Sequence, residues 1–233
     1  MKNTYIIHGK HSVLAALDNP KRKIIEILAT TESAKFLPAH TKFTPITNID
    51  LKTLTYDAPH QGLAARVSPV TLHDIPKAIS DNPKCKIIIL DQVTDPQNLG
   101  AILRSAAAFG INAVIYPKNG SATENATVAK AACGALDMVP LIEVTNISTT
   151  LLELKKEGFW SIGMDGSAKQ SISSAKNLFD GKLAVVMGSE GAGIRPLVMK
   201  TCDLIVKLPI NSAMESLNVS TAAAIVMWEV SKG

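Results

Sequence analysis

The chain has 233 residues, 46% of them hydrophobic, which is long enough for one domain of ordinary size and a second, smaller one. Its net charge of +4 is compatible with an acidic partner such as nucleic acid but does not require one. The chain opens without an apolar run of signal-peptide length, and its longest apolar stretch, residues 222–228, is too short to cross a bilayer, so we expect a cytoplasmic protein that makes no membrane contact.

The first part of the chain predicts a small α/β module. Residues 5–7, 23–29 and 64–67 predict strands, and residues 12–17 predict a helix capped by Ser12. Residues 1–82 contain ten Lys and Arg against seven Asp and Glu, together with all five histidines. This basic bias favours a partner-binding role for the module.

A proline-rich segment follows, with Pro69, Pro76, Pro83 and a turn signal at residues 81–83. An apolar pattern inside it suggests a turn that packs on a neighbouring element through Leu72, Ile75 and Ile79. We therefore divide the chain into a small domain, residues 1–68, a linker, residues 69–84, and a larger domain, residues 85–233.

The larger domain alternates apolar strands with segments of helix length. The predicted strands are residues 87–90, 113–116, 139–144, 159–164, 183–187 and 204–208. The predicted helices are residues 99–109, 126–135, 148–157 and 216–230. Nearly continuous apolar strands are typical of a parallel sheet covered on both faces. The pattern predicts a doubly wound α/β domain whose ligands bind beyond the carboxyl ends of the strands.

Three polar, glycine-containing loops leave predicted strands: residues 91–100, 188–193 and 208–220. Loops at the carboxyl ends of parallel strands can form one pocket, so we expect the active site there. The middle loop is neither a dinucleotide fingerprint nor a phosphate-binding loop of the P-loop type. Taken alone, it is equally consistent with a structural turn.

Arg104 lies in an otherwise apolar helical stretch, six residues after Asn98. Such an arginine is usually a surface group, but a buried one needs an anion, which Glu190 or a nucleic-acid phosphate could supply. Ser216 is a candidate N-cap of the last helix, and Asn218 then offers amide donors and an acceptor to a ligand.

The three cysteines are widely spaced and lack any metal-ligand pattern with the histidines. We expect Cys85, Cys133 and Cys202 to be small buried hydrophobic residues, and we expect no metal.

The three loops together resemble the signature motifs of the SpoU-type branch of the SPOUT superfamily, the RNA ribose 2'-O-methyltransferases. The motifs correspond to residues 98–104, 186–193 and 208–220. Residues 7–17 and 60–66 resemble the start and end of the small substrate-binding domain of these enzymes, so the resemblance spans nearly the whole chain. Within the family it favours the bacterial enzymes that methylate a guanosine of 23S rRNA.

The resemblance implies a C-terminal domain tied in a deep trefoil knot, an exception to the rule that chains do not thread loops, and a homodimer whose interface builds the active site. It also implies S-adenosylmethionine as cofactor, held by Met187, Gly188, Leu208, Ile210 and Leu217. The implied catalytic and RNA-facing residues are Asn98, Arg104, Glu190, Ser216 and Asn218.

One position departs from the family pattern, since Ser212 stands where glycine is usual. Two other functions stay open at this point: a tRNA ribose 2'-O-methyltransferase, and a non-catalytic RNA-binding ribosome-assembly factor that keeps the fold. All five implied catalytic residues are present, which argues against the second.

Overall fold

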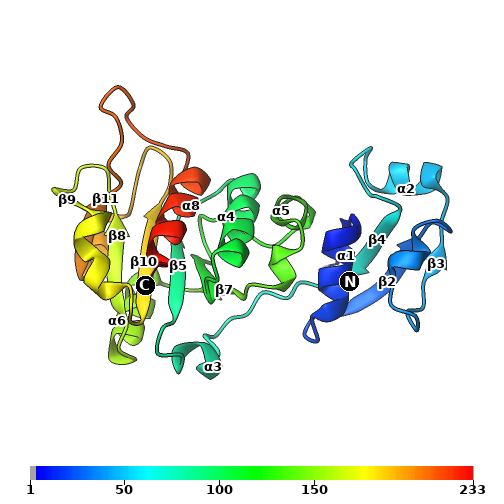
Figure 1. Ribbon diagram of the computed structural model, residues 1–233, viewed down its shortest axis with the longest axis horizontal. Helices are drawn as coiled ribbons and strands as arrows, with labels where there is room; N and C mark the ends of the chain where they lie inside the picture. Colours follow the sequence, from blue (N-terminus) through cyan, green and yellow to red (C-terminus); the bar gives the residue numbers. More distant parts are fainter. Residues whose placement is uncertain (1–3, 233) are drawn as a thin grey trace.

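The computed structural model describes residues 4–232, which form two sheets joined by an extended segment (Figure 1). The first sheet has the strand order β1-β4-β2-β3 and forms the N-terminal module, which we define as residues 4–68. Its strands are β1 (Tyr5–His8), β2 (Ile24–Ala29), β3 (Thr44–Pro45) and β4 (Leu63–Val67). Its helices are α1 (Lys10–Asp18), the 3-10 turn η1 (Ala34–Phe36) and α2 (Asn48–Leu54).

The three strands and the helix predicted for this module are present, but the predicted cap is wrong. Helix α1 begins after Gly9, and Ser12 lies inside it as a buried residue. The sequence analysis also missed β3 and α2. The start of α2 has a readable signal, because the Thr47 hydroxyl accepts a hydrogen bond from the Asp50 backbone N–H at 3.1 Å.

The second sheet has the order β7-β6-β5-β10-β8-β11-β9, and every pairing in it is parallel. Its strands are β5 (Lys86–Asp91), β6 (Ala113–Pro117), β7 (Leu141–Val144), β8 (Trp160–Met164), β9 (Gln170–Ser171), β10 (Leu183–Gly188) and β11 (Leu204–Lys207). The predicted parallel sheet is therefore confirmed, with β9 as an additional edge strand that the sequence analysis did not predict.

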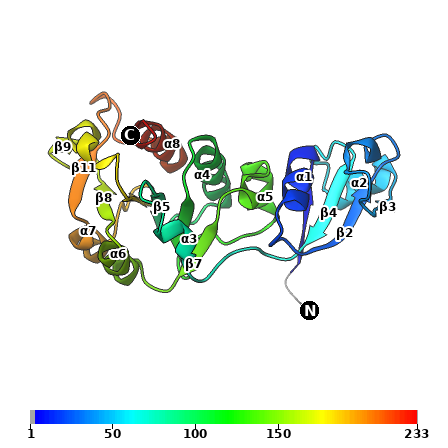
Figure 2. The ribbon, with the colours of Figure 1, turned by 60° about the horizontal axis from the view of Figure 1, so that its bottom comes forward.

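Helices cover both faces of this sheet, with α8, α4 and α5 in a row on one side and α7, α6 and α3 on the other (Figure 2). The helices are α3 (Lys77–Ser80), α4 (Pro96–Ala108), α5 (Ala126–Ala132), α6 (Ile147–Lys156), α7 (Pro196–Thr201) and α8 (Val219–Val230), with 3-10 turns η2 (Ala135–Asp137) and η3 (Ile172–Leu178). Alternate residues of β5 serve the two layers. Ile88 and Leu90 join the core under α4 and α8, whereas Ile87 and Ile89 join the core under α6 and α7. Leu72, Ile75 and Ile79 pack against the second of these cores, as predicted.

Helix boundaries differ from the predicted ones where local capping decides. Helix α4 begins at Pro96, because Asp95 caps it and proline fits the first helical position. Helix α5 ends at Ala132, because Cys133 and Gly134 adopt left-handed conformations with φ of 50° and 95°. Helix α8 begins at Val219 rather than at residue 216, because Asn218 is its cap.

The cysteine prediction holds only in part. Cys85 is buried, and burial raises the pKa of its thiol to about 11. Cys202 is half-buried, and Cys133 is exposed, so the prediction of burial is wrong for Cys133. Among residues 4–232, no helix is long and apolar enough to cross a membrane, and no group of three side chains could hold a metal ion.

A buried ionic network joins the N-terminal module to the α5 region. Arg22 donates from Nη1 to Glu124 and from Nε to Asp137, at 2.6 Å each, and these three side chains are at most 3% exposed. The Tyr5 hydroxyl donates to the same Glu124 oxygen at 2.6 Å. Because a buried charge is stable only when it is paired, this network fixes the two modules against each other.

The network makes stability depend on pH. Burial by itself would raise the pKa of Glu124, but the hydrogen bond from Tyr5 and the charge of Arg22 outweigh burial and hold the pKa below its ordinary value of 4.5. A carboxyl group of this kind stabilises the folded state above its unfolded pKa, and the contribution is lost as the pH falls through the lowered folded pKa. We therefore expect the midpoint of thermal unfolding to drop as the pH falls below 4.5.

Calorimetry at several pH values below neutrality checks this expectation. Glu124→Gln should be less stable than the wild type at neutral pH and should lose less stability on acidification. Glu153→Gln, a change on the exposed face of α6, is the matched control and should follow the wild type. Equal acid sensitivity of all three proteins would show that the Glu124 network does not supply the pH dependence.

Candidate active site

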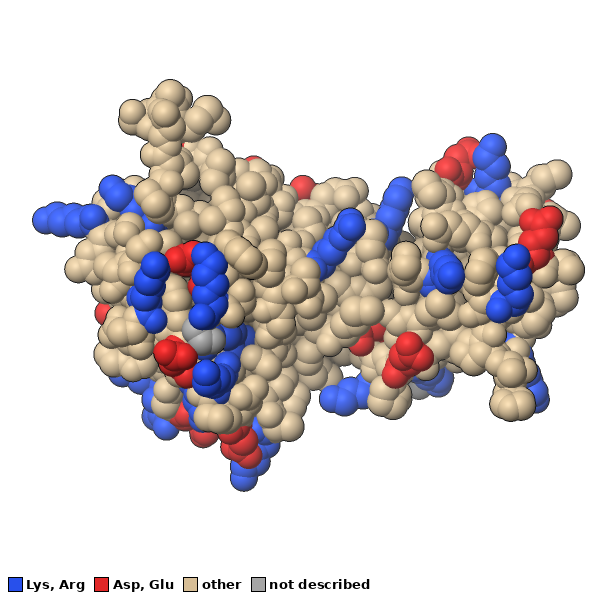
Figure 3. Space-filling model, viewed as in Figure 1, with Lys and Arg blue, Asp and Glu red and all other residues tan. Residues whose placement is uncertain are grey.

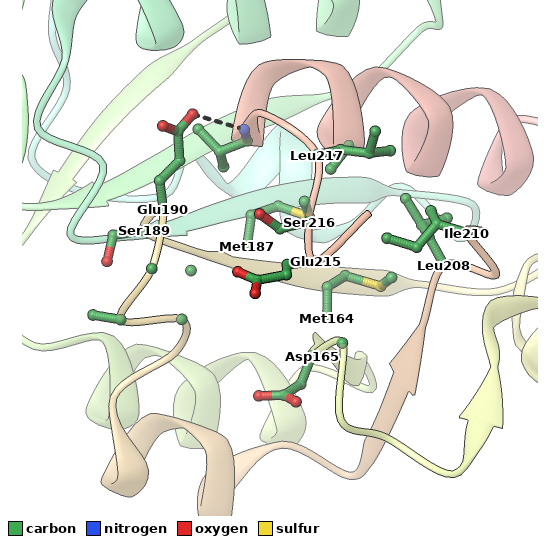
Figure 4. A pocket seen from close by; sticks show the side chains of 17 residues that line it. Met164, Asp165, Met187, Ser189, Glu190, Leu208, Ile210, Glu215, Ser216 and Leu217 are labelled. Atoms are coloured by element: carbon green, nitrogen blue, oxygen red, sulfur yellow. Dashed lines mark hydrogen bonds between the residues drawn. The ribbon is translucent and has the colours of Figure 1, made fainter. Parts of the chain in front are cut away.

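A cavity of about 420 Å³ lies at the carboxyl edge of the second sheet, between the ends of β8, β10 and β11 and the loop that leads into α8 (Figure 4). It is lined by Met164, Asp165, Gly166, Met187–Gly193, Leu208, Ile210, Glu215, Ser216, Leu217, Val219 and Ala222. Its position agrees with the expectation that ligands bind beyond the carboxyl ends of parallel strands.

The structure brings most of the predicted site residues to this cavity. The five residues proposed to hold the cofactor, Met187, Gly188, Leu208, Ile210 and Leu217, all line it. Glu190 and Ser216, from the proposed catalytic set, line it as well. Figure 4 shows that these side chains reach the cavity from the end of β10 and from the segment between β11 and α8.

Glu190, Asn218 and Asn98 form a hydrogen-bonded cluster beside the cavity. One Glu190 carboxylate oxygen accepts from Asn218 Nδ2 at 2.5 Å and from the Val219 backbone N–H at 3.1 Å. Asn218 Nδ2 also donates to Asn98 Oδ1 at 3.0 Å. The cluster thus links the loop after β10, the start of α8 and the first turn of α4.

Of the five predicted catalytic residues, Arg104 alone is found neither in this cluster nor among the residues that line the cavity. Its side chain is exposed, and its Nη1 donates to Cys133 Sγ at 3.7 Å. Of the two suggested anions for Arg104, Glu190 is not paired with it within residues 4–232, because Glu190 accepts from Asn218 and Val219 instead. Six residues advance a helix by about 240° of net rotation, so Asn98 and Arg104 leave α4 in different directions.

The loop after β10 approaches its own backbone closely at Gly188. A Cβ atom there would lie 2.1 Å from the Gly193 carbonyl carbon and 2.4 Å from the Ile194 nitrogen. The Ser189 N–H donates to the Gly193 carbonyl at 3.1 Å, and the Gly193 N–H donates to the Ser189 carbonyl at 3.0 Å. Glycine is therefore required at position 188, and the loop both makes a tight turn and forms a cavity wall.

A buried carboxylate anchors the end of this loop. Asp91, at the end of β5, is fully buried and accepts from the Arg195 backbone N–H and from Arg195 Nε, at 2.8 Å each. Arg195 is the residue that precedes α7. The cavity wall is thereby fixed to the centre of the sheet.

The cavity has an acidic and apolar lining. Asp165, Glu190 and Glu215 contribute carboxylates, and no Lys, Arg or His is among the residues that line it. Methionine, leucine, isoleucine, valine and alanine side chains supply the apolar surface. Such a lining suits a ligand that carries positive charge on a largely apolar body.

The sequence analysis missed the exit of β8. Met164, Asp165 and Gly166 line the cavity, although no candidate was proposed from this loop. A signal was present, because an Asp-Gly pair directly follows a predicted apolar strand. Sequence order alone does not reveal that β8 lies between β10 and β11 in the sheet.

Ser212 and Ser216 are both exposed in the segment that leads into α8. Ser212 lies in an exposed turn and is not among the residues with positive φ, so serine at this position imposes no left-handed strain. Ser216 is exposed on the cavity wall, two residues before the cap of α8, so its candidate role as N-cap is wrong.

Asn218 has two roles that substitution can separate. Its Oδ1 caps α8 by accepting from the Ser220 N–H at 2.9 Å, while its Nδ2 donates to Glu190 and Asn98. Asn218→Ala removes both roles and should lower the free energy of unfolding by about 1 kcal/mol. Asn218→Asp keeps the cap but places a second carboxylate against Glu190. It should therefore retain most of the stability but lose the hydrogen bond that holds the Glu190 side chain in place.

Thermal unfolding and single-turnover assays of methyl transfer, the activity that the family resemblance implies, would measure these two effects. Equal loss of activity with equal loss of stability in both variants would contradict a separate role for the amide group. Glu153→Gln, on the exposed face of α6, is a control that should change neither measurement.

Two family models match consecutive parts of the chain. Residues 86–228 match the SpoU rRNA Methylase family, and residues 6–73 match RNA 2'-O ribose methyltransferase substrate binding. The chain is 40% identical to the 23S rRNA (guanosine-2'-O-)-methyltransferase RlmB of Vibrio vulnificus, over 98% of this chain and 96% of that protein. It is 41% identical to RlmB of Escherichia coli strain K12, over 96% of each protein.

A solved structure shows the same fold across both modules. The SpoU methyltransferase AviRb of Streptomyces viridochromogenes, in complex with the cofactor AdoMet, superimposes with a TM-score of 0.83. The match covers 98% of this chain and 90% of that one at 20% sequence identity.

Proposed function

Because the chain belongs to the SpoU rRNA methylase family, we propose that it transfers a methyl group from S-adenosylmethionine to the ribose 2'-hydroxyl of a guanosine in 23S rRNA. The RlmB enzymes of Vibrio vulnificus and Escherichia coli, which carry that activity in their names, match almost the full length of this chain. The observation that carries the proposal is the Asn98–Asn218–Glu190 cluster beside an acidic cavity.

The cavity fits the proposed cofactor in size and charge. Its volume of about 420 Å³ lies in the range of small-molecule sites. S-adenosylmethionine supplies, when bound, a methyl group activated by a sulfonium charge. Asp165, Glu190 and Glu215 offer carboxylates to the positive groups of this molecule, and Met187, Leu208, Ile210 and Leu217 offer apolar surface.

The residues of the chain then have to align the ribose hydroxyl and assist the loss of its proton. An arginine side chain stays protonated in proteins, so Arg104 is a poor general base and a good ligand for a phosphate. We assign Arg104 to the phosphate next to the target ribose, where that phosphate can take up the proton. Glu190, held by Asn218, is assigned to orientation of the nucleotide, together with Asn98 and Ser216.

The position of Arg104 supports a homodimer. It is exposed and absent from the lining of the cavity in its own chain. Helix α8, which packs beside α4, carries Ile225 and Trp228, which are 42% and 53% exposed, and the Trp228 ring packs against Phe109 with 5.9 Å between ring centroids. Burial of this apolar face by a second copy would allow Arg104 of one subunit to reach the cavity of the other.

We assign the N-terminal module to RNA binding. The test of the proposed function incubates the protein with tritiated S-adenosylmethionine and with 23S rRNA or tRNA, both free of the modification. Label on 23S rRNA supports the proposal. Label on tRNA alone would support a tRNA ribose methyltransferase, and retained cofactor and RNA binding without label would support an assembly factor.

A further inference from the structure

Tyr56 has an unusual combination of exposure and backbone conformation. It follows the end of α2. The residue is 93% exposed, the highest value among the exposed large hydrophobic residues that the structure describes. Its φ is +51° and that of the following Asp57 is +58°. A bulky residue in this left-handed region is uncommon and strained.

No packing interaction accounts for tyrosine at this position. A ring that remains almost entirely in water contributes no burial to folding, and glycine would adopt the same backbone conformation without strain. Strained residues of this kind concentrate at sites that bind ligands. The ring is therefore available for contact with a molecule outside the chain.

The loop that carries the ring is fixed at several points. The Asp57 N–H donates to the Lys52 carbonyl at 2.9 Å, and the Asp57 carboxylate pairs with Lys52 Nζ at 3.2 Å. Further along, the Pro59 carbonyl accepts from His8 Nδ1 at 3.2 Å, and Gln61 Oε1 accepts from the Lys10 N–H at 2.9 Å. These contacts hold the loop, residues 55–62, on the side of the N-terminal module that faces α5 (Figure 1).

Cationic side chains continue from this loop toward Arg104. Helix α5 packs against β1, and partial burial together with the charges of Lys130 and His60 lowers the pKa of His8, which places these groups in one electrostatic environment. Arg104 lies against the C-terminal end of α5, the helix that carries Lys130, because the Cys133 Sγ donates to the Lys130 backbone carbonyl at 3.5 Å and accepts from Arg104 Nη1 at 3.7 Å.

Among the residues that the structure describes, these cations have no carboxylate partner, although Lys10 Nζ lies 3.9 Å from the centroid of the Phe36 ring. Within residues 4–232, neither Lys10, Lys130 nor Arg104 forms an ion pair with a carboxylate. Figure 3 shows Lys and Arg side chains with few acidic ones over α4, α5 and the adjoining part of the N-terminal module. A band of unpaired positive charge that ends at an exposed aromatic ring matches the requirements for single-stranded RNA.

We propose that this surface binds an unpaired stretch of the RNA substrate, with the Tyr56 ring stacked on a base and Lys130 in contact with the phosphates that lead to Arg104. The proposal rests on the proposed function, because it takes RNA as the substrate. Unpaired bases expose faces on which aromatic side chains stack, whereas bases inside a duplex do not. The surface should therefore prefer single-stranded over double-stranded RNA of the same sequence.

Binding of a fluorescein-labelled fragment of 23S rRNA, as a single strand and annealed to its complement, tests the stacking. Tyr56→Ala should weaken binding of the single strand about tenfold, while Tyr56→Phe keeps the ring and should bind like the wild type. Leu152→Ala, an exposed apolar change on α6 at the opposite face, should have no effect. Wild-type affinity of Tyr56→Ala would overturn the proposal.

Tyr56→Gly separates a binding role from a structural one. Because glycine relieves the left-handed strain, this variant should unfold at a higher temperature than the wild type while binding the single strand as weakly as Tyr56→Ala. Lower thermal stability with unchanged RNA affinity would assign Tyr56 to the fold and overturn the proposal.

The phosphate contact is tested by the salt dependence of binding. Lys130→Gln should reduce the slope of log affinity against log salt by about one, and Lys156→Gln on α6 should leave it unchanged.

In methylation assays, Tyr56→Ala should raise KM for RNA with little change in kcat. If the wild type methylates no RNA but Tyr56→Ala still weakens RNA binding, the proposed function is contradicted, while the inference that this surface binds RNA is supported. If the wild type methylates 23S rRNA and Tyr56→Ala has the wild-type KM, only this inference fails.

Discussion

We expect Arg104→Ala to lower kcat for methyl transfer by about 10²- to 10³-fold while leaving the affinity for S-adenosylmethionine near that of the wild type. The cavity proposed for the cofactor does not include Arg104, so removal of the guanidinium should not disturb it. Within residues 4–232 the side chain has no carboxylate partner, so its removal should also leave stability nearly unchanged. What is lost is the group assigned to the phosphate beside the target ribose.

Radiolabel transfer to 23S rRNA and calorimetric titration of the cofactor measure the two effects. Arg104→Lys keeps the positive charge but loses the two-pronged geometry of the guanidinium, so it should recover only part of the rate. Lys156→Ala removes an exposed cation from the opposite face and serves as the control. Substantial turnover by Arg104→Ala would contradict the assignment.

The same variant tests the proposed dimer. If Arg104 acts in the cavity of a second copy, a mixed dimer of Arg104→Ala and Glu190→Ala chains contains one site with both residues intact. If each variant alone has little activity, mixing the two under conditions that allow subunit exchange should therefore restore part of the activity. Failure to regain activity despite proven exchange would place both residues in one chain's site.

We expect Gly188→Ala to disrupt the cavity itself. The added Cβ would lie 2.1 Å from the Gly193 carbonyl carbon and 2.4 Å from its oxygen. These are backbone atoms, so no rotamer change can relieve the contact, and the loop has to move. We expect the free energy of unfolding to fall by up to about 3 kcal/mol and cofactor affinity to fall with it.

Chemical denaturation and cofactor titration test this expectation. Gly181→Ala is a matched control, because its Cβ would meet only the Leu178 carbonyl oxygen, at 3.9 Å, and Gly181 is outside the cavity. Wild-type cofactor affinity in Gly188→Ala would show that the loop after β10 does not form the cofactor site.

Apolar periodicity was sufficient to predict the six main strands of the second sheet, because strands buried on both faces are nearly continuous in hydrophobicity. It could not give the strand order, which inserts β10 between β5 and β8 and brings the β8 exit to the cavity. For the same reason Asp165 was missed, although Gly188 and Leu208 were identified.

Contacts between distant segments account for the other differences. Of the two partners suggested for Arg104, Glu190 is hydrogen-bonded to Asn218 instead, and the nucleic-acid phosphate stays a prediction, because the direction of a helical side chain depends on where the helix packs. The pairing of Arg22 with Glu124 and Asp137 joins residues more than 100 positions apart, so no local sequence pattern predicts it. The trefoil knot implied by the family resemblance stays a prediction.

The most direct test of the account is mass spectrometry of nucleosides from 23S rRNA that lacks the modification, after incubation with the protein and S-adenosylmethionine. We predict the appearance of 2'-O-methylguanosine at a single position, and its absence when Arg104→Ala replaces the wild type. Methylation of a base instead of a ribose, or no methylation of 23S rRNA in naked or ribosomal form, would contradict the account.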